Sequence, residues 1–314
     1  MTTRPAMIDL GGPELTIVDG GSFRLDGAAL YGVFPRVFWE KLNRPDEDNR
    51  VLLAVAPAVV TTPEGVVIID PGIGTGWSSR AIDRYDIRGT RTAGEILSDT
   101  GHSLSDVVAI IATHLHFDHI AGAVQTTVDS GDESGHSDNV IDNPDHLEPA
   151  FPQAKLYLQR AELEAARQPD LRTSSYGAAY AARVYEREGR CVVLEGESQP
   201  FPGIRVVPTG GHTPGHQAIW LEGTEAKFLL TGDLVPTASH VRSEVLEGVD
   251  HEPAVTSFVK ASLLAEAVSA GAYLTFYHAP RVRWARIRSG PSGVYTLEET
   301  LTVDVSGSSR NAND

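Results

Sequence analysis

The chain has 314 residues, 41% of them hydrophobic, and its 42 acidic against 26 basic residues give a formal net charge of −16. This balance argues against nucleic acid and anionic membranes as partners, because both need a basic protein surface. A single cysteine, Cys191, excludes an intramolecular disulfide and a cysteine-rich zinc site. No secretory signal and no run of about 18 apolar residues is visible, so we expect a cytoplasmic protein without membrane spans.

Apolar runs and turn residues predict several strands in the first half of the chain. Residues 51–60 and 66–70 flank a Thr-Thr-Pro-Glu-Gly segment with turn chemistry, and they predict a β-hairpin. A short helix is expected at 92–99 and a buried strand at 107–113. That strand leads directly into the sequence Thr-His-Leu-His-Phe-Asp-His at 113–119.

The second half reads as alternating strands and helices. Residues 160–187 are mostly helical in pattern, and 253–270 predict a helix with Pro253 in its first turn and Gly271 at its end. Apolar residues of that helix recur at helical spacing and predict its buried face: Val255, Phe258, Val259, Leu263, Ala267 and Ala270. Strands are expected at 155–159, 203–209, 217–223, 227–233, 272–278, 282–289 and 293–305.

These elements predict a single domain over residues 1–305. An N-terminal arm occupies about 15–50, and residues 128–150 are acidic and rich in Ser and Gly, as expected of an exposed loop insert. Residues 306–314 are expected to form a disordered tail. Two groups of strands, each followed by helical segments, fit a sandwich of two sheets with outer helices.

Histidine and acidic side chains stand at the ends of the predicted strands. Imidazole and carboxylate are the donors that a borderline metal such as zinc prefers. Side chains that follow different strands can converge on one point, so these residues predict a metal site. We expect His114, His116 and His212 to hold one metal, Asp118, His119 and His278 to hold a second, and Asp233 to bridge the two.

Two further polar residues accompany the candidate ligands. Asp70 ends the strand at 66–70, and His216 lies at the end of the Gly-Gly-His-Thr-Pro-Gly-His turn at 210–216. We expect both to orient the ligating imidazoles through hydrogen bonds rather than to bind metal.

The order of these motifs resembles the metallo-β-lactamase superfamily. The His-x-His-x-Asp-His pattern at 114–119 matches the central metal motif of that superfamily, and His212, Asp233 and His278 match its remaining ligands. The resemblance covers about residues 50–285. It implies an α+β fold, an αβ/βα sandwich of two mixed sheets with outer helices, whose metals lie at one edge between the sheets.

The N-terminal segment from Asp19 to Val55 is similar to the arm of a lactonase branch of this superfamily. That branch includes quorum-quenching N-acyl homoserine lactonases and methyl parathion hydrolases. The similarity rests on the Gly-Gly, Leu-Asp-Gly and Gly-Val-Phe-Pro motifs, on Asp-Glu-Asp-Asn-Arg, and on the segments around His212, Asp233 and His278. It implies a lactone or ester substrate and a homodimer.

Other activities of the superfamily fit the sequence less well. A flavodiiron oxygen reductase carries glutamate where His116 stands, and a thioesterase of the glyoxalase II type has a helical domain where strands are expected after His278. An arylesterase or phosphotriesterase and an iron-dependent sulfur dioxygenase remain open alternatives. A metal-binding protein without catalysis is disfavoured because every position of the ligand set is present.

Aromatic residues of the arm are candidates for an apolar substrate pocket. Phe34, Phe38 and Trp39 lie close together in sequence, and Phe117 lies inside the metal motif. The alternative is that the arm residues fill the core or a dimer contact. The chain departs from the better-known homoserine lactonases at Pro236, where they carry a tyrosine that touches the substrate carbonyl. His240 is the nearest polar substitute in the sequence.

The resemblance implies a hydrolytic mechanism with two divalent metal ions, zinc by default. A metal-bridging hydroxide attacks the carbonyl carbon of a lactone, since zinc lowers the pKa of bound water to about 7. Asp118 hydrogen-bonds this hydroxide and passes its proton to the departing alkoxide.

Overall fold

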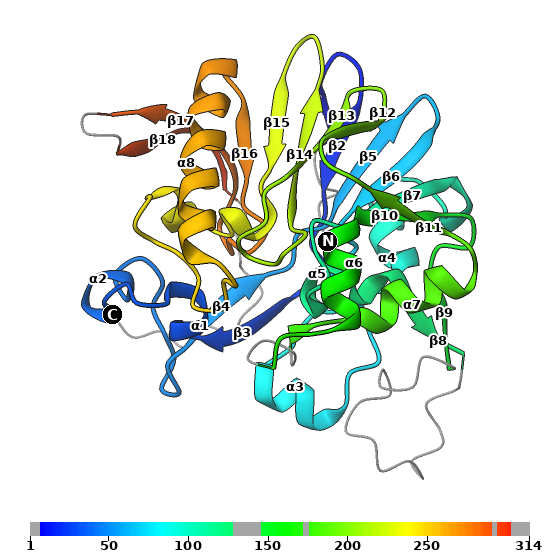
Figure 1. Ribbon diagram of the computed structural model, residues 1–314, viewed down its shortest axis with the longest axis horizontal. Helices are drawn as coiled ribbons and strands as arrows, with labels where there is room; N and C mark the ends of the chain where they lie inside the picture. Colours follow the sequence, from blue (N-terminus) through cyan, green and yellow to red (C-terminus); the bar gives the residue numbers. More distant parts are fainter. Residues whose placement is uncertain (1–6, 128–145, 172–175, 291–293, 303–314) are drawn as a thin grey trace.

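Two seven-stranded mixed sheets pack face to face in the computed structural model, which describes residues 7–127, 146–171, 176–290 and 294–302 (Figure 1). The first sheet contains, in spatial order, β1 (Met7–Asp9), β2 (Glu14–Ile17), β5 (Ala58–Thr62), β6 (Gly65–Ile69), β7 (Val107–Ile111), β10 (Lys155–Gln159) and β11 (Cys191–Leu194). The second contains β12 (Ser198–Phe201), β13 (Ile204–Pro208), β14 (Gln217–Glu222), β15 (Lys227–Leu230), β16 (Tyr273–Thr275), β17 (Val282–Ser289) and β18 (Tyr295–Thr302). The predicted α+β sandwich is confirmed.

Alternating side chains of the strands build the core between the sheets. Val67 and Ile69 of β6 pack there against Ile219 and Leu221 of β14, and Phe228 of β15 is also fully buried in this layer. Successive side chains of a strand point to opposite faces, so the residues between these ones face the outer layers. The result is one apolar layer that fixes the distance and register between the two sheets.

Helices cover the outer faces of both sheets (Figure 1). The first sheet is covered by α4 (Ala93–Ser98), α6 (Arg160–Arg167) and α7 (Ala179–Arg187), with α3 (Ser79–Tyr85) nearer the arm. The second is covered by α8 (Pro253–Ala270). Residues 160–187, predicted to be mostly helical, therefore hold the two helices α6 and α7.

The ends of α8 are as predicted, and of its predicted buried face Leu263 and Ala267 are buried. Pro253 is the first helical residue, and Gly271 ends the helix in the left-handed region. Val255 and Phe258, expected to be buried, are exposed, and the buried residues of the helix are Thr256, Lys260, Leu263, Leu264 and Ala267. The charged Lys260 tolerates this position because its Nζ donates to the carbonyls of Arg242 (3.1 Å) and Val245 (2.6 Å).

The arm forms a small sheet of its own beside the sandwich. β3 (Ser22–Asp26) pairs antiparallel with β4 (Arg50–Ala54), and between them lie α1 (Gly27–Tyr31) and α2 (Arg36–Trp39). The single strand predicted at 51–60 is therefore wrong. It is interrupted before β5 at Pro57, whose nitrogen has no hydrogen to donate, and its two halves pair with different partners.

Part of the expected acidic loop is ordered as a strand. β9 (Leu147–Pro149) pairs antiparallel with β8 (Val124–Thr126), so the prediction of a loop throughout 128–150 is wrong at its C-terminal end. Residues 128–145 of that loop and the predicted tail at 306–314 lie outside the described residues. No helix in the described part of the chain is both long and apolar enough to cross a membrane.

The layer between the sheets gives a stability prediction. Changing Phe228 to Ala removes a fully buried ring, and we expect the free energy of unfolding to fall by about 3–5 kcal/mol because a cavity remains. Chemical denaturation measures this change. The control is Phe258→Ala on α8, where the ring is 78% exposed and the expected loss is about 0.5 kcal/mol or less. Equal losses in the two variants would contradict the assignment of the core.

Candidate metal centre

Five strands deliver the predicted ligands and their neighbours to one edge of the sandwich. Asp70 follows β6, and the 113–119 segment follows β7 and includes α5 (Phe117–Ile120). His212 follows β13, Asp233 lies in a short 3-10 turn after β15, and His278 follows β16. Because β6 runs parallel to β7 and β15 parallel to β16, their C-terminal ends lie together.

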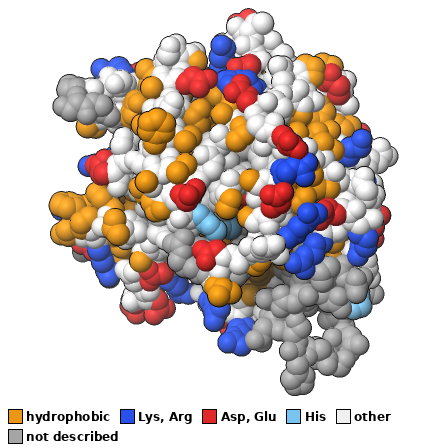
Figure 2. All heavy atoms as spheres, viewed as in Figure 1, with side chains coloured by type: hydrophobic (Ala, Val, Ile, Leu, Met, Phe, Trp, Pro, Cys, Tyr) orange, Lys and Arg blue, Asp and Glu red, His pale blue; other side chains and the backbone are white. Residues whose placement is uncertain are grey.

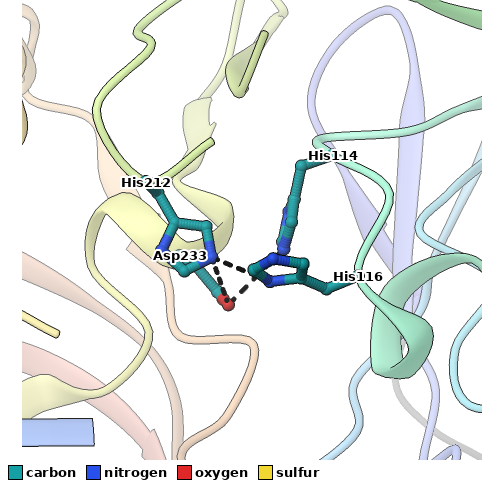
Figure 3. A group of neighbouring side chains, drawn as sticks. All are labelled: His114, His116, His212 and Asp233. Atoms are coloured by element: carbon teal, nitrogen blue, oxygen red, sulfur yellow. Dashed lines mark hydrogen bonds and ion pairs between the residues drawn. The ribbon is translucent and has the colours of Figure 1, made fainter. Parts of the chain in front are cut away.

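Four of these side chains form the first candidate metal group. His114, His116, His212 and Asp233 are all buried, and each offers a ligand atom within 4.8 Å of the others. Figure 3 shows the three imidazoles and the carboxylate pointing toward one another from separate segments. His212 Nε2 lies 3.1 Å from His116 Nδ1 and 3.4 Å from Asp233 Oδ2. A tetrahedral zinc ion spaces its ligand atoms by about 3.3 Å, so this group fits one metal ion.

Asp118, His119 and His278 form the second candidate group on the other side of Asp233. The Nε2 atoms of His119 and His278 are 3.1 Å apart, and Asp118 Oδ2 lies 3.3 Å from His278 Nε2. The remaining oxygen of Asp233, Oδ1, lies 3.2 Å from His119 and 3.3 Å from His278. The two carboxylate oxygens of Asp233 thus face different groups, as a bridging ligand requires.

Asp70 orients the ligand-bearing segment after β7. Its Oδ1 accepts from the backbone N–H of Thr113 (2.7 Å), and its Oδ2 accepts from the hydroxyl of Thr113 (2.6 Å) and from His119 Nδ1 (2.9 Å). Since the Thr113 hydroxyl donates to Asp70, its oxygen accepts from His114 Nδ1 (3.0 Å). These bonds leave the Nε2 lone pairs of His114 and His119 directed into the cluster.

The imidazoles from the second sheet are oriented in the same way. His212 Nδ1 donates to Asp250 Oδ1 (2.9 Å) and also lies 3.0 Å from Glu247 Oε2. His278 Nδ1 donates to the carbonyl of Ala54 at the end of β4 (2.8 Å). The arm thereby contributes a backbone acceptor to the site.

His216 holds the bridging residue in place through the backbone. Its Nε2 accepts from the N–H of Asp233 (3.2 Å), while its Nδ1 is occupied by the hydroxyl of Thr209. Gly232, with φ +50°, allows this approach, because a Cβ there would lie 2.7 Å from His216 Nε2. The structure thus places His216 beside the cluster, where it holds the backbone of Asp233 rather than a ligating imidazole.

The electrostatics of the cluster favour a cation at its centre. Burial lowers the pKa of His116 to about 3 and that of His114 well below its usual range, so both rings are neutral. Burial also opposes charge on His119, but Asp233, Asp118 and Asp70 together raise its pKa to about 9. Among the described residues, His114 Nε2 and Asp233 Oδ1 are buried without a hydrogen-bond partner. The neutral imidazoles of His114 and His116, the converging carboxylates and the buried unsatisfied atoms fit bound divalent metal ions.

Glu162 is a supporting residue that the sequence analysis missed. Its carboxylate is buried between the two ligand loops, where it accepts from the N–H of Leu115 (2.8 Å), the hydroxyl of Thr213 (2.6 Å) and the N–H of Gly215 (3.1 Å). Asp250 and Glu247 were missed as well. A single acidic residue on a helix or loop carries no motif, so only the fold reveals these roles.

The predicted pocket residues separate into two places. Phe117 is buried and lines a cavity over the cluster, together with His116, Asp118, Asp233 and His278. Phe34, Phe38 and Trp39 are not among the described residues that line it. Trp39 stacks on Tyr31 with 5.0 Å between ring centroids, and Phe38 is exposed.

His240 lies in the junction between the arm and the second sheet. Its Nε2 donates to the carbonyl of Leu30 (2.9 Å), its Nδ1 accepts from the hydroxyl of Thr237 (2.8 Å), and its ring stacks on Tyr31. Both ring nitrogens are therefore engaged within the protein, and the described lining of the cavity over the cluster does not include His240. His240 therefore joins the arm to the segment after β15, in contrast to the substrate contact that the sequence suggests.

The role of Glu162 can be tested through metal affinity. Glu162→Gln replaces one acceptor oxygen by a donor group that faces other donors, so the two loops lose part of their support. We expect metal affinity to fall by about 10–100-fold, measured by competition with a chromophoric chelator. The matched control is Glu164→Gln, an exposed position on the same helix, α6, with unchanged affinity. Equal affinities in both variants would rule out the role assigned to Glu162.

One face of the molecule shows histidine side chains with acidic side chains beside them. They are visible near the middle of the view in Figure 2, in a hollow of the surface. The candidate ligands themselves are at most 7% exposed, so most of the cluster lies below the surface.

Comparisons with known proteins agree with this geometry. The family model described as the metallo-beta-lactamase superfamily matches residues 52–271. The N-acyl homoserine lactonase of Bacillus cereus is 28% identical over 225 residues, which are 67% of this chain and 75% of the relative. The N-acyl homoserine lactonase AiiA of Bacillus thuringiensis subsp. kurstaki is 26% identical over 215 residues, 63% of this chain and 71% of that protein.

Solved structures share the fold over nearly the whole chain. A probable metal-dependent hydrolase from Staphylococcus aureus superposes with a TM-score of 0.81 at 22% identity, covering 95% of this chain and 99% of the other. AidC, a dizinc quorum-quenching lactonase, superposes with a TM-score of 0.69 at 16% identity, covering 94% and 96%. The chain belongs to the metallo-β-lactamase superfamily, and its lactonase homologues indicate that it is a metal-dependent hydrolase.

Proposed function

We propose that the protein opens the ring of a lactone, most specifically an N-acyl homoserine lactone, with two divalent metal ions at the cluster. The observation that carries this proposal is the placement of Asp233 between the two ligand groups. Its Oδ2 faces His212 at 3.4 Å and its Oδ1 faces His119 at 3.2 Å, which suits a carboxylate shared by two ions. Zinc is the metal we propose, because five imidazoles and two carboxylates form a donor set of the kind it prefers.

Each ligand has a separate role in this proposal. His114, His116 and His212 hold one ion, Asp118, His119 and His278 hold the other, and Asp233 bridges them. When bound, such ions supply Lewis acidity and make water a nucleophile near neutral pH. The chain's own residues orient the ligands and control the protons around them.

Asp118 is the residue we propose for proton transfer. Its carboxylate lines the cavity over the cluster, and its backbone carbonyl accepts from the hydroxyl of Tyr277 (2.9 Å), which fixes its position. Burial favours the neutral acid, but His119 and His278 hold the pKa of Asp118 below its usual value. The ionised carboxylate can take a proton from the attacking water and deliver it to the ring oxygen as the C–O bond breaks.

The choice of substrate rests on the relatives and on the chemistry of the residues around the site. The curated relatives are N-acyl homoserine lactonases, and AidC is described in complex with the product N-hexnoyl-L-homoserine. In this chain the cavity over the cluster combines the acidic and imidazole groups with apolar walls from Leu25, Leu53 and Phe117. A small polar ring attached to an acyl group matches that division.

We also propose that two copies of the chain associate through the arm. Val33, Val37, Phe38 and Leu42 of the arm expose large apolar side chains, and Val33 is fully exposed. Apolar groups gathered on one segment are typical of a contact with another protein. A second copy of this chain is the partner we propose.

The proposed activity can be tested by acid release on ring opening. We expect the metal-loaded protein to open a long-chain N-acyl homoserine lactone, measured with a pH indicator, and a chelator to abolish the reaction. Asp233→Asn is expected to lose metal and rate together, because the amide nitrogen cannot bridge two cations. An inactive wild-type protein with two ions per chain would refute the lactonase proposal and direct the search to aryl esters and phosphotriesters.

The proposed association can be tested by light scattering coupled to size-exclusion chromatography. We expect the mass of two chains at micromolar concentration, and a shift toward one chain in a Val33→Asp, Phe38→Asp variant, because the charges oppose burial of the arm. Arg80→Asp on α3 is the charge-changing control. A monomeric wild-type protein would overturn this proposal and leave the enzymatic one unaffected.

A further inference from the structure

The cavity over the cluster is lined by one phenol, that of Tyr176, which is neither a proposed metal ligand nor part of the proposed proton transfer. The cavity measures about 20 Å³, which is room for one water molecule. Four candidate ligands line it, namely His116, Asp118, Asp233 and His278. Apolar side chains of the arm and Tyr176 line it as well.

Backbone contacts of the residues after Tyr176 hold it next to the 113–119 segment. The following residue, Gly177, forms an antiparallel bridge with His116, and the N–H of Ala178 donates to the carbonyl of Leu115 (2.7 Å). The ring centroid of Tyr176 lies 6.0 Å from that of His116. The position of the phenol is therefore tied to the segment that carries the candidate ligands.

Tyr176 is also the only residue with an alcohol or phenol group among the described residues that line this cavity. The other polar groups there are imidazoles and the carboxylates of Asp118, Asp233 and Glu247. Asp118 and Asp233 are proposed metal ligands, and Glu247 Oε2 lies 3.0 Å from His212 Nδ1, so these carboxyl groups are engaged within the cluster. Of the two imidazoles, His278 turns its Nδ1 toward the carbonyl of Ala54, and His116 turns its Nδ1 toward His212.

We propose that Tyr176 is a catalytic residue that donates a hydrogen bond to the carbonyl oxygen of the substrate as negative charge develops on it. This inference rests on the proposed hydrolysis of a lactone or ester. In that reaction the oxygen of water bonds to the carbonyl carbon, the C–O bond of the ring breaks, and the proton of the water reaches the departing oxygen. Tyr176 keeps its proton throughout and stabilises the oxyanion by position alone.

Tyr176 can supply the hydroxyl group that the chain lacks at Pro236. His240 does not supply a donor there, because both of its ring nitrogens bond within the protein, to Leu30 and Thr237. Tyr176 approaches the same cluster from a different segment, between α6 and α7. A hydroxyl donor is thus available at the site although the loop after Asp233 does not supply one.

The test compares Tyr176→Phe with Tyr180→Phe in metal-loaded protein. Tyr180 lies four residues further along, on α7, and is not part of the described cavity lining. For Tyr176→Phe we expect kcat on the lactone to fall by about 100-fold with a smaller change in KM, as when a single oxyanion donor is removed. Metal content and melting temperature should match those of the wild-type protein, which separates this role from a structural one.

A second measurement does not depend on turnover. A phosphonate that mimics the tetrahedral oxyanion should bind Tyr176→Phe at least about 10-fold more weakly than it binds Tyr180→Phe, measured by calorimetry. Equal phosphonate affinity in the two variants, with two metal ions in each, would overturn the role of Tyr176. Because this readout needs no lactone, failure of the lactonase proposal and failure of the Tyr176 proposal are distinguishable.

Discussion

The rest of this structure depends on the contacts that the buried carboxylate of Asp233 makes with two groups of imidazoles. Its two oxygens approach His212 on one side and His119 on the other. So many donor atoms in a dry environment are costly unless a cation satisfies them or hydrogen bonds orient them. The sheets, the loops and the arm keep these donor atoms close together.

Three further buried carboxylates hold the ligand-bearing segments in place. Asp70 joins the end of β6 to the segment after β7, and Glu162 joins that segment to the loop of His212. Asp250 fixes the ring of His212 from the opposite side. Asp70 and Glu162 accept hydrogen bonds from backbone and hydroxyl donors, and Asp250 accepts one from His212 Nδ1, so negative charge is stabilised beside the ligands. Rigid support of this kind keeps the ligand atoms within the few tenths of an ångström that metal coordination tolerates.

The sequence predicted which side chains converge, because each candidate ligand follows a strand and strand ends are visible as apolar runs. The sandwich was predicted for the same reason, and Pro253 and Gly271 marked the ends of α8. Glu162 and Asp250 could not be found in this way, because their role depends on distant donors that only the fold brings near. Lys260 was missed because a charged residue in a core position contradicts the apolar pattern, and only two backbone carbonyls make it tolerable.

The division of the ligands between the sheets has a consequence for the making of the protein. His114, His116, Asp118 and His119 follow a strand of the first sheet, whereas His212, Asp233 and His278 follow strands of the second. During synthesis the chain emerges from its N-terminus, so the first four donors are present long before their counterparts. Neither metal group is complete until His212 and His278 have left the ribosome and the second sheet has closed on the first. Cofactor acquisition is thus a late event, and it joins two halves of the chain that are synthesised at different times.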